Sequence, residues 1–483
     1  MSEPTEEPPT APAIPEDAAS HGLARQTAEF LVVLCLTVLI FRTFAAEAYI
    51  VPTGSMAPTL LGQHREVVCP NCEYRLVLGV DEEGRPAGRA LCPNCGQTGL
   101  DASPAVESNG DRVLVQKFLY DVRRPKRWEV AVFHFPGDPT QAYVKRVVGL
   151  PGESFRVIRG DVWADGRIAR KTLKEQRAIR VPVFDNNFVP KDRDRVPRWS
   201  FSRGRPFERL VSGWTARGTG FVHEPPELHP ERTDWVEYRH WEPDRARYAP
   251  VHDFNAYNGA EVRGENVVTD LAFEARVVPG ADARVFSVRI DSGSDRFVVE
   301  FPVGLGEAPV LAWNNRVVSI DAGKGRLTAG EAGLVEVSVM DRRVTAAVNG
   351  VLAFEPFDYD APANGVGPGP SPVGFGARGG AFSVGGVKVF RDVYYTSALA
   401  STPRRPFGVD EPYRLGADEF FVLGDNSPVS NDSRFWPESP VVPGEYFLGK
   451  PFLDHLPGQV VPLRVFGRSL YWVPDPREIR YIR

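Results

Sequence analysis

The chain has 483 residues, a formal net charge of −5 and 42% hydrophobic residues. This length exceeds what one hydrophobic core normally uses, so at least two domains are expected and a single small module is excluded. Because 57 basic residues face 62 acidic ones, the composition gives no electrostatic footprint for a nucleic-acid partner. The 45 glycines and 44 prolines favour β-structure and turns, and five cysteines are too few for a disulfide-dense scaffold.

The N-terminal part of the chain has two segments of opposite character. Residues 1–23 are predicted to be a disordered tail, because the first twenty hold five prolines, five acidic side chains and no lysine or arginine. Residues 30–41 then form a charge-free run, and its extension to residues 24–46 predicts a transmembrane helix. Two alternatives stay open: a buried core helix, and a signal peptide cleaved at the small residues near position 46.

Four of the five cysteines fall in two Cys-Pro-Asn-Cys pairs. Cys69 and Cys72 form the first pair, and Cys92 and Cys95 form the second, 19 residues further on. This spacing is typical of zinc ribbons, in which four thiolates fill the tetrahedral positions of one structural ion. Residues 63–109 are therefore predicted to be a zinc-ribbon-like insertion, and two disulfides are the alternative.

The remaining pattern predicts a mainly β protein. Short apolar runs separated by turn signals indicate a small antiparallel β-domain from about residue 47 to residue 160. Residues 160–254 lack periodicity and are predicted to be an irregular insertion. Residues 255–396 show strands of about six residues between Gly or Asp turns, which predicts a jelly-roll-like β-sandwich. This last segment resembles concanavalin-like and laminin-G-like domains, so a glycan or protein ligand and a spacer role are both open.

Three polar segments are each ordinary when taken alone. Ser55 lies in a proline-stiffened stretch directly after the apolar run. Lys145 lies in a strand pattern, where alternation places it on the same face as Tyr143 and Val147. These apolar neighbours exclude water from the amine, which favours its neutral form and lowers its pKa. Residues 424–434 form a polar run behind an apolar strand. A turn serine, a solvated lysine and a surface turn are the ordinary interpretations.

Together and in this order, the three segments resemble the type I signal peptidases, also called leader peptidases, which use a serine and a lysine. The resemblance covers residues 45–62, 110–159 and 412–450. It implies that Ser55 is the nucleophile and Lys145 the general base. It also implies a membrane-anchored serine endopeptidase that removes signal peptides from exported preproteins, cleaving after small-x-small segments.

The resemblance further assigns supporting roles around these two residues. By it, Ser430 orients the lysine amine, Asp432 and Arg434 form a supporting salt bridge, Thr53 adds a hydroxyl to the oxyanion hole, and Gly424, Asp425 and Asn426 shape the motif. The chain departs from the family where Pro437 follows Trp436, since glycine is common at that place. This departure concerns the outer wall of the substrate cleft.

The same resemblance implies how the chain is organised. The peptidase core is discontinuous and consists of residues 47–62, 110–159 and 404–483. A single pass through the cell (inner or cytoplasmic) membrane places the catalytic domain on the extracytoplasmic side. Catalysis needs no cofactor, and the partners are exported preproteins and membrane lipid. Two alternatives remain, an anchored glycan or protein recognition protein with an inactive peptidase core and a self-cleaving Ser-Lys peptidase of the repressor type.

Overall fold

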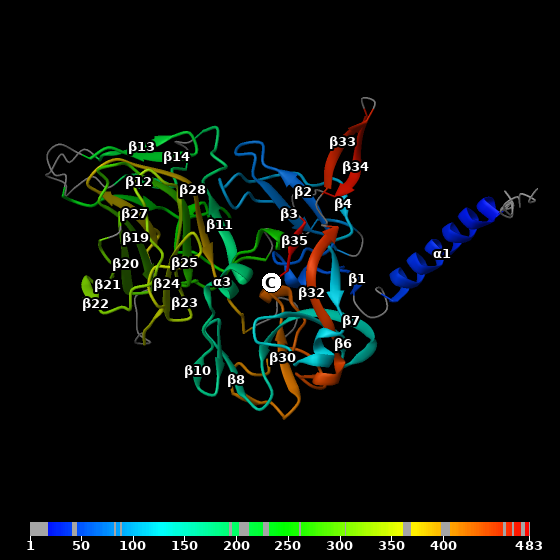
Figure 1. Cartoon of the computed structure of the whole chain (residues 1–483). Coiled ribbons are helices and arrows are strands. Elements are labelled where there is room, and N and C mark those ends of the chain that lie inside the picture. Colours follow the sequence, from blue (N-terminus) through cyan, green and yellow to red (C-terminus); the bar gives the residue numbers. More distant parts are fainter. Residues whose placement is uncertain are drawn as a thin grey trace, which may run out of the picture.

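The structure of the chain is a computed structural model in which strands dominate (Figure 1). It describes residues 18–40, 46–81, 84–86, 89–192, 196–201, 212–225, 231–259, 262–304, 306–360, 369–397, 406–456, 460–465, 468–474 and 479–482. The predicted mainly β fold class is confirmed. Residues 1–17 of the predicted disordered tail lie outside the described residues.

One long helix stands away from the strands in Figure 1. This helix, α1 (Ala18–Ile40), has 23 residues and begins six positions before the predicted residue 24. The prediction of a transmembrane helix over residues 24–46 is wrong at its C-terminal end, because Ala46 belongs to strand β1 (Ala46–Ile50). Over the residues that the structure describes, no helix combines the length and apolarity of a membrane span.

The peptidase-like part contains an antiparallel sheet of eight strands drawn from distant parts of the chain. In spatial order these are β1, β5 (Arg112–Gln116), β32 (Phe447–Leu456), β6 (Val130–Phe135), β7 (Asp138–Gly149), β30 (Glu419–Leu423) and β31 (Val442–Pro443), with β35 (Arg480–Tyr481) beside β32. Alternation along β6 buries both of its faces: Val130 and Val132 pack with Val113, whereas Ala131 and Phe133 join a second cluster.

A smaller sheet of four strands adjoins this one. It contains β10 (Arg167–Ile168), β9 (Asp161–Ala164), β8 (Ser154–Ile158) and β29 (Tyr413–Arg414) in that order. Phe155 of β8 stacks on Phe421 of β30, with 4.1 Å between the ring centroids. The regular strands therefore continue past residue 160, where the sequence predicted an irregular insertion to begin.

The cysteine-containing insertion forms its own small sheet. Strand β2 (His64–Val68) pairs with β3 (Arg75–Gly79) and with β4 (Glu107–Ser108). All four cysteines are buried in one cluster with Leu76 and Leu78 of β3. Two short helices, α2 (Leu119–Val122) and α3 (Leu173–Ile179), and a hairpin of β33 (Val460–Val465) and β34 (Arg468–Pro474) lie elsewhere in the chain.

Two large antiparallel sheets form the predicted β-sandwich. One holds β13 (Trp214–Arg217), β14 (Gly220–His223), β28 (Phe382–Arg391), β18 (Leu271–Pro279), β23 (Gly333–Met340), β24 (Arg343–Val348) and β25 (Val351–Leu352), with β11 (Val181–Asp185) beside β28 and β26 (Phe357–Asp358) beside β24. The other holds β12 (Trp199–Phe201), β15 (Asp234–Tyr238), β27 (Val373–Arg378), β19 (Val285–Ser292), β20 (Asp295–Pro302), β21 (Val310–Trp313) and β22 (Arg316–Val318). One buried apolar cluster draws on both sheets.

The prediction of an irregular insertion over residues 160–254 is wrong for much of that range. Strands β11 to β15 lie in it and belong to the sandwich, where β14 pairs with β28 and β15 pairs with β27. These strands have five residues or fewer, and β11, β14 and β15 pair with strands that follow more than 130 positions later, so local periodicity could not reveal them. Among the described strands of this range, β9 and β10 belong to the four-stranded sheet, and the short hairpin of β16 (Trp241–Glu242) and β17 (Arg247–Tyr248) stands apart from both sandwich sheets.

Phe375 offers a test of this enlarged sandwich. Its buried ring lies 5.2 to 5.8 Å from the rings of Trp214, Phe221 and Phe273, two of which come from the supposedly irregular segment. Phe375→Ala leaves a cavity and is expected to lower the free energy of unfolding of the sandwich by about 3–5 kcal/mol. Urea unfolding followed by tryptophan fluorescence measures it, with the exposed Val317→Ala as the control. Equal midpoints for the two variants would contradict the assignment.

Candidate active site

Ser55 is held in a short turn that buried neighbours anchor. The 3-10 turn η2 (Gly54–Met56) closes with a hydrogen bond of 3.0 Å from the backbone N–H of Ala57 to the carbonyl oxygen of Gly54. Met56 and Leu60 are fully buried in the cluster that includes β5 and β6, so the turn is fixed on the sheet. The Ser55 side chain is thereby directed towards β7.

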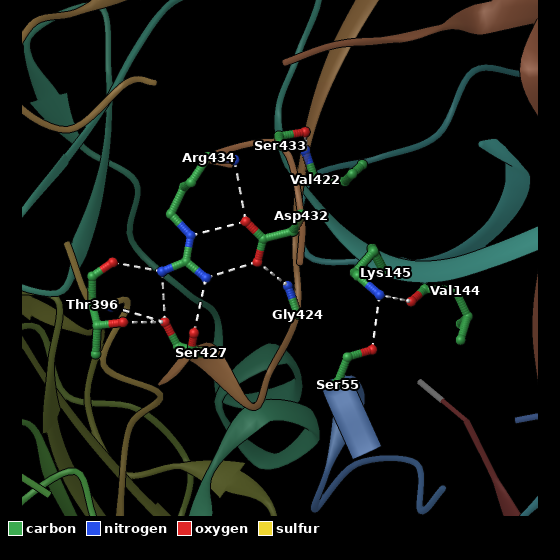
Figure 2. A network of polar contacts seen from close by, with 10 residues as sticks. All are labelled: Ser55, Val144, Lys145, Thr396, Val422, Gly424, Ser427, Asp432, Ser433 and Arg434. Carbon is green, nitrogen blue, oxygen red and sulfur yellow. Dashed lines mark hydrogen bonds and ion pairs between the residues drawn. The ribbon is translucent and has the colours of Figure 1, made fainter. Parts of the chain in front are cut away.

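Lys145 lies on β7 opposite Ala131 of β6. Its Nζ donates hydrogen bonds to Ser55 Oγ at 2.8 Å and to the carbonyl oxygen of Val144 at 3.1 Å (Figure 2). Nζ also lies 5.3 Å from the centroid of the Tyr143 ring, as strand alternation predicts. Burial of the amine, which is 4% exposed, lowers the pKa of Lys145 to about 8, although the charges of Asp432 and Asp425 act in the opposite direction.

Asp432 and Arg434 form the predicted ion pair. Arg434 Nε and Nη2 donate to the two carboxylate oxygens of Asp432 at 2.9 and 2.7 Å, and both side chains are fully buried. Asp432 Oδ2 also accepts a hydrogen bond of 3.0 Å from the backbone N–H of Gly424. The guanidinium reaches further to Ser427 and Thr396, as Figure 2 shows, so this pair holds residues 424–434 in place.

Ser430 lies beside the dyad without the predicted hydrogen bond to the amine. Its side chain is fully buried, and its Oγ has no hydrogen-bond partner in the described part of the chain. A Cβ on Gly424 would lie 2.1 Å from Ser430 Oγ and 2.5 Å from the carbonyl oxygen of Ser55. Glycine at position 424 is therefore required for this close approach. The orienting role of Ser430 stays a prediction.

Thr53 and the cleft lie on the open side of Ser55. Thr53 Oγ1 is 3.5 Å from Ser55 Oγ, which is a long contact for a hydrogen bond between hydroxyl groups. A cleft of about 870 Å³ opens here, and its lining includes Thr53, Ser55, Tyr143, Lys145, Tyr257 and Asn258. The cleft therefore gives access to Ser55 from the side of Thr53.

Two predicted shaping residues take part in contacts that the sequence did not reveal. Asp425 forms a fully buried ion pair with Arg146, whose Nε donates to Oδ1 at 2.7 Å. Arg146 Nη1 also donates to the carbonyl oxygen of Trp128 at 2.6 Å. Since Arg146 follows Lys145, this pair fixes the strand that carries the amine. The sequence signal for this ion pair was an arginine, Arg146, next to Lys145 in an apolar strand, since a buried arginine needs an acidic partner.

Asn426 connects residues 424–434 to the turn that carries Ser55. Its backbone N–H donates to the carbonyl oxygen of Ser55 at 3.0 Å, and its Nδ2 donates to that of Gly54 at 2.8 Å. Its side-chain amide also pairs with Asn258, and Asn255 donates to its Oδ1. Both of these asparagines come from the insertion, and no local sequence signal marks them as site residues.

The four cysteines form a second cluster, and none of them is in a disulfide. Cys69 Sγ is 3.5 Å from Cys95 Sγ, and Cys72 Sγ is 3.6 Å from Cys92 Sγ. Their Sγ atoms all lie within 4.8 Å of one another. A disulfide has sulfurs about 2.05 Å apart, whereas four thiolates at 2.3 Å from a tetrahedral zinc ion lie about 3.8 Å apart. The spacing fits a shared metal ion and does not fit two disulfides.

Comparison with known proteins places the peptidase region. Residues 96–201 match the family model described as signal peptidase, peptidase S26. That range contains Lys145, while Ser55 and residues 424–434 lie outside it. The resemblance that the sequence predicted is confirmed, since this region is similar to serine peptidases of the signal peptidase type.

Curated relatives cover more of the chain. The probable signal peptidase I-2 of Synechocystis sp. is 30% identical over 129 residues, which is 25% of this chain and 56% of that protein. The signal peptidase I of Pseudomonas aeruginosa is 27% identical over 175 residues, or 34% of this chain and 45% of the relative. That of Leptolyngbya laminosa is 29% identical over 173 residues, or 33% of this chain and 59% of the relative. The chain thus spans about half the length of these relatives.

Solved structures show distant likenesses. The carbohydrate binding module CBM66 from Bacillus subtilis is 7% identical and covers 40% of this chain and 94% of its own, with a TM-score of 0.26. The galectin LEC-6 of Caenorhabditis elegans is 14% identical and covers 25% of this chain and 81% of its own, with a TM-score of 0.19. At these TM-scores, neither likeness says what the sandwich binds.

The lowered pKa of Lys145 predicts a pH-dependent cost to stability. The folded protein binds this proton less tightly than the unfolded chain, whose lysine has the ordinary pKa of 10.5. The buried amine therefore lowers the free energy of unfolding by its full amount below about pH 8, and this loss disappears as the pH rises towards 10.5. Lys145→Met should raise the free energy of unfolding at pH 7 by on the order of 2 kcal/mol, with a smaller gain at pH 10. Urea unfolding at both pH values measures the gain.

Lys174→Met is the matched control, because Lys174 is an exposed lysine in α3. We expect this variant to leave the free energy of unfolding unchanged at either pH. A Lys145→Met protein that is less stable than the parent at pH 7 would contradict a costly buried amine.

Proposed function

We propose that this chain is a membrane-anchored serine endopeptidase that removes signal peptides from exported preproteins with a Ser55 and Lys145 dyad. The single observation that carries the proposal is the 2.8 Å hydrogen bond between Lys145 Nζ and Ser55 Oγ in a buried setting. A pKa near 8 leaves part of the amine neutral at physiological pH, so it can accept the serine proton. The peptidase region and the signal peptidase relatives support the class of substrate.

The proposed reaction has two halves that use the same amine. The neutral amine of Lys145 removes the proton from Ser55 Oγ as this oxygen attacks the carbonyl carbon of the scissile peptide bond. The resulting ammonium then protonates the departing amine, and the C–N bond breaks to leave an acyl ester on Ser55. In the second half, the amine removes a proton from a water molecule that attacks the ester, and Ser55 Oγ recovers a proton as it leaves.

The negative charge of the tetrahedral intermediate needs donors that are already in place. The backbone N–H of Ser55 and the hydroxyl of Thr53 are proposed to supply them, since both lie on the side of the cleft. We assign Ser430 to the orientation of the amine, because a fully buried hydroxyl without a partner can accept a hydrogen bond from an ammonium that has moved off Ser55. No cofactor takes part in this scheme.

The substrate is proposed to bind as an extended strand along β7. In the described part of the sheet, β30 pairs with β7 only from Arg146 to Gly149, and the preceding cleft residues Gln141 and Ala142 are exposed. An added strand there would place alternate side chains in shallow pockets, which suits small residues before the cleaved bond.

The membrane anchor is the part of the proposal that rests on the sequence. The apolar run at residues 30–41 would insert into the cell membrane, and the family resemblance would place the catalytic domain on the extracytoplasmic side. Preproteins carry their own apolar segment into the same bilayer, so anchoring raises their effective concentration at the dyad. Membrane lipid is then a partner of the enzyme.

We also propose that the cysteine insertion holds one structural zinc ion. The sulfur distances and two matching turns support this. In each turn the backbone N–H of the first cysteine, Cys69 or Cys92, donates to the carbonyl oxygen five residues later, and its own carbonyl oxygen accepts from the N–H four residues later. A glycan or protein ligand of the sandwich stays a prediction of the sequence. The alternative function, an anchored recognition protein with an inactive core, is disfavoured by the hydrogen-bonded dyad.

Loss of either dyad residue should abolish cleavage. Ser55→Ala removes the nucleophile and Lys145→Met removes the base, so each is expected to lower preprotein cleavage by at least about 1000-fold in detergent-solubilised enzyme. Cleavage of a preprotein with a small-x-small site is followed by gel mobility and product mass. Ser383→Ala and Lys174→Met change exposed residues of the same types and should cleave normally. Retained activity in either dyad variant would reject the mechanism.

Zinc content tests the cysteine cluster independently of activity. The purified protein is expected to contain one zinc ion per chain, and Cys92→Ser should lose it because three thiolates bind the ion more weakly. Elemental analysis by plasma mass spectrometry measures the metal. Cys35→Ser is the matched control, since Cys35 is an exposed cysteine of α1. Thiol titration that finds only one free thiol in the unfolded chain would instead establish two disulfides.

A further inference from the structure

A short turn of the inserted segment contacts the nucleophile turn. This turn, η3 (Ala256–Asn258), precedes the first long strand of the sandwich by about a dozen residues. Asn258 and Asn426 form a reciprocal amide pair: Asn258 Nδ2 donates to Asn426 Oδ1 at 2.8 Å, and Asn426 Nδ2 donates to Asn258 Oδ1 at 2.7 Å. The two side chains are 6% and 1% exposed, so water cannot replace these bonds without cost.

Asn426 is hydrogen-bonded both to Asn258 and to the backbone of the nucleophile turn. Its Nδ2 donates to the carbonyl oxygen of Gly54 at 2.8 Å, which belongs to the peptide bond between Gly54 and Ser55. A peptide bond is planar, so the orientation of this oxygen also fixes the direction of the Ser55 N–H. That N–H is the proposed backbone donor of the oxyanion hole, and such a donor acts through its fixed direction.

The neighbouring residues of η3 support the same contact. The ring of Tyr257 lies so close to Gly54 that a Cβ there would be 2.0 Å from its Cε1, and its hydroxyl donates to the carbonyl oxygen of Gln63 at 2.8 Å. Asn255 Oδ1 accepts from the backbone N–H of Tyr257 at 3.1 Å, which fixes the turn itself. The turn is thus built against the nucleophile, and Tyr257 and Asn258 line the cleft.

We propose that Asn258 is a positioning residue of the peptidase, acting through Asn426 on the direction of the Ser55 N–H. By this inference the insertion completes the active site and is more than a spacer. The inference rests on the proposed function in one respect, namely that Ser55 is the nucleophile. It does not depend on which peptide the enzyme cleaves.

The test compares Asn258→Ala with Asn266→Ala in the full-length protein. Asn266 lies in the same segment and bonds to Asp253, away from Asn426, so its loss tests general damage to the segment. We expect Asn258→Ala to lower kcat for preprotein cleavage about tenfold with KM changed less than twofold, since the lost contact acts on the transition state. Asn266→Ala should cleave normally. Equal kcat values for the two variants would overturn the proposal.

A second measurement separates this inference from the choice of substrate. The rate at which a small fluorophosphonate labels Ser55 is measured for each variant, because the phosphonyl oxygen needs the same oxyanion donor. Asn258→Ala should label about tenfold more slowly than the parent. If the parent labels normally but cleaves no preprotein, the proposed function fails while the labelling rates still decide the role of Asn258.

A double-mutant cycle distinguishes positioning from a structural role. If Asn258 acts through Asn426, the Asn258→Ala and Asn426→Ala double variant should label no more slowly than Asn426→Ala alone. If the two substitutions instead lower the labelling rate by factors that multiply, Asn258 does not act through Asn426.

Asn258→Asp is a second variant, for the case that the alanine variant does not fold. It keeps the acceptor for Asn426 Nδ2, so its labelling rate should fall by an intermediate amount. Asn426→Ala removes both hydrogen bonds of the Asn258–Asn426 pair. A labelling rate for Asn258→Asp as low as that of Asn426→Ala would contradict the proposal.

Discussion

The amine of Lys145 is kept out of water and 2.8 Å from Ser55 Oγ, and much of the surrounding structure holds it there. Removing water from a lysine disfavours its charged form, so other interactions must supply the free energy that holds it there. The pairing of β6 with β7 fixes its backbone opposite Ala131, and apolar clusters pack on both faces of β6. A rigid, doubly packed strand pair is what allows an unfavourable side chain to stay in place.

Two buried ion pairs set the electrostatics of the same site. Asp432 and Asp425 would each favour a charged amine, yet each is bound to an arginine, Arg434 or Arg146. Burial has a larger effect than these two charges, so the pKa of Lys145 falls to about 8. The same pairs fix residues 424–434 against β7, so one set of contacts determines both the position and the protonation of the base.

The sequence predicted those parts of the site that are encoded by neighbouring residues. Ser55, Lys145 and the Asp432–Arg434 pair lie in short motifs, and strand alternation was enough to place Lys145 beside Tyr143. The sequence could not predict interactions between segments that are far apart in the chain. The Arg146 partner of Asp425 and the pairings of β11, β14 and β15 depend on contacts across more than 130 positions. The close approach of Ser430 to Gly424 depends on how their loop folds.

Both ends of the inserted segment contact the residues that surround Ser55 and Lys145. On one side, the η3 turn reaches Asn426 through Asn258. On the other, the chain leaves the sandwich through Thr396, whose carbonyl oxygen accepts a hydrogen bond from Arg434 and whose backbone N–H donates to Ser427 Oγ. Both contacts converge on residues 424–434, the loop that is hydrogen-bonded to the turn carrying Ser55. If Asn258 acts as we propose, a change in the packing of the sandwich would reach Ser55 and Lys145 through this loop.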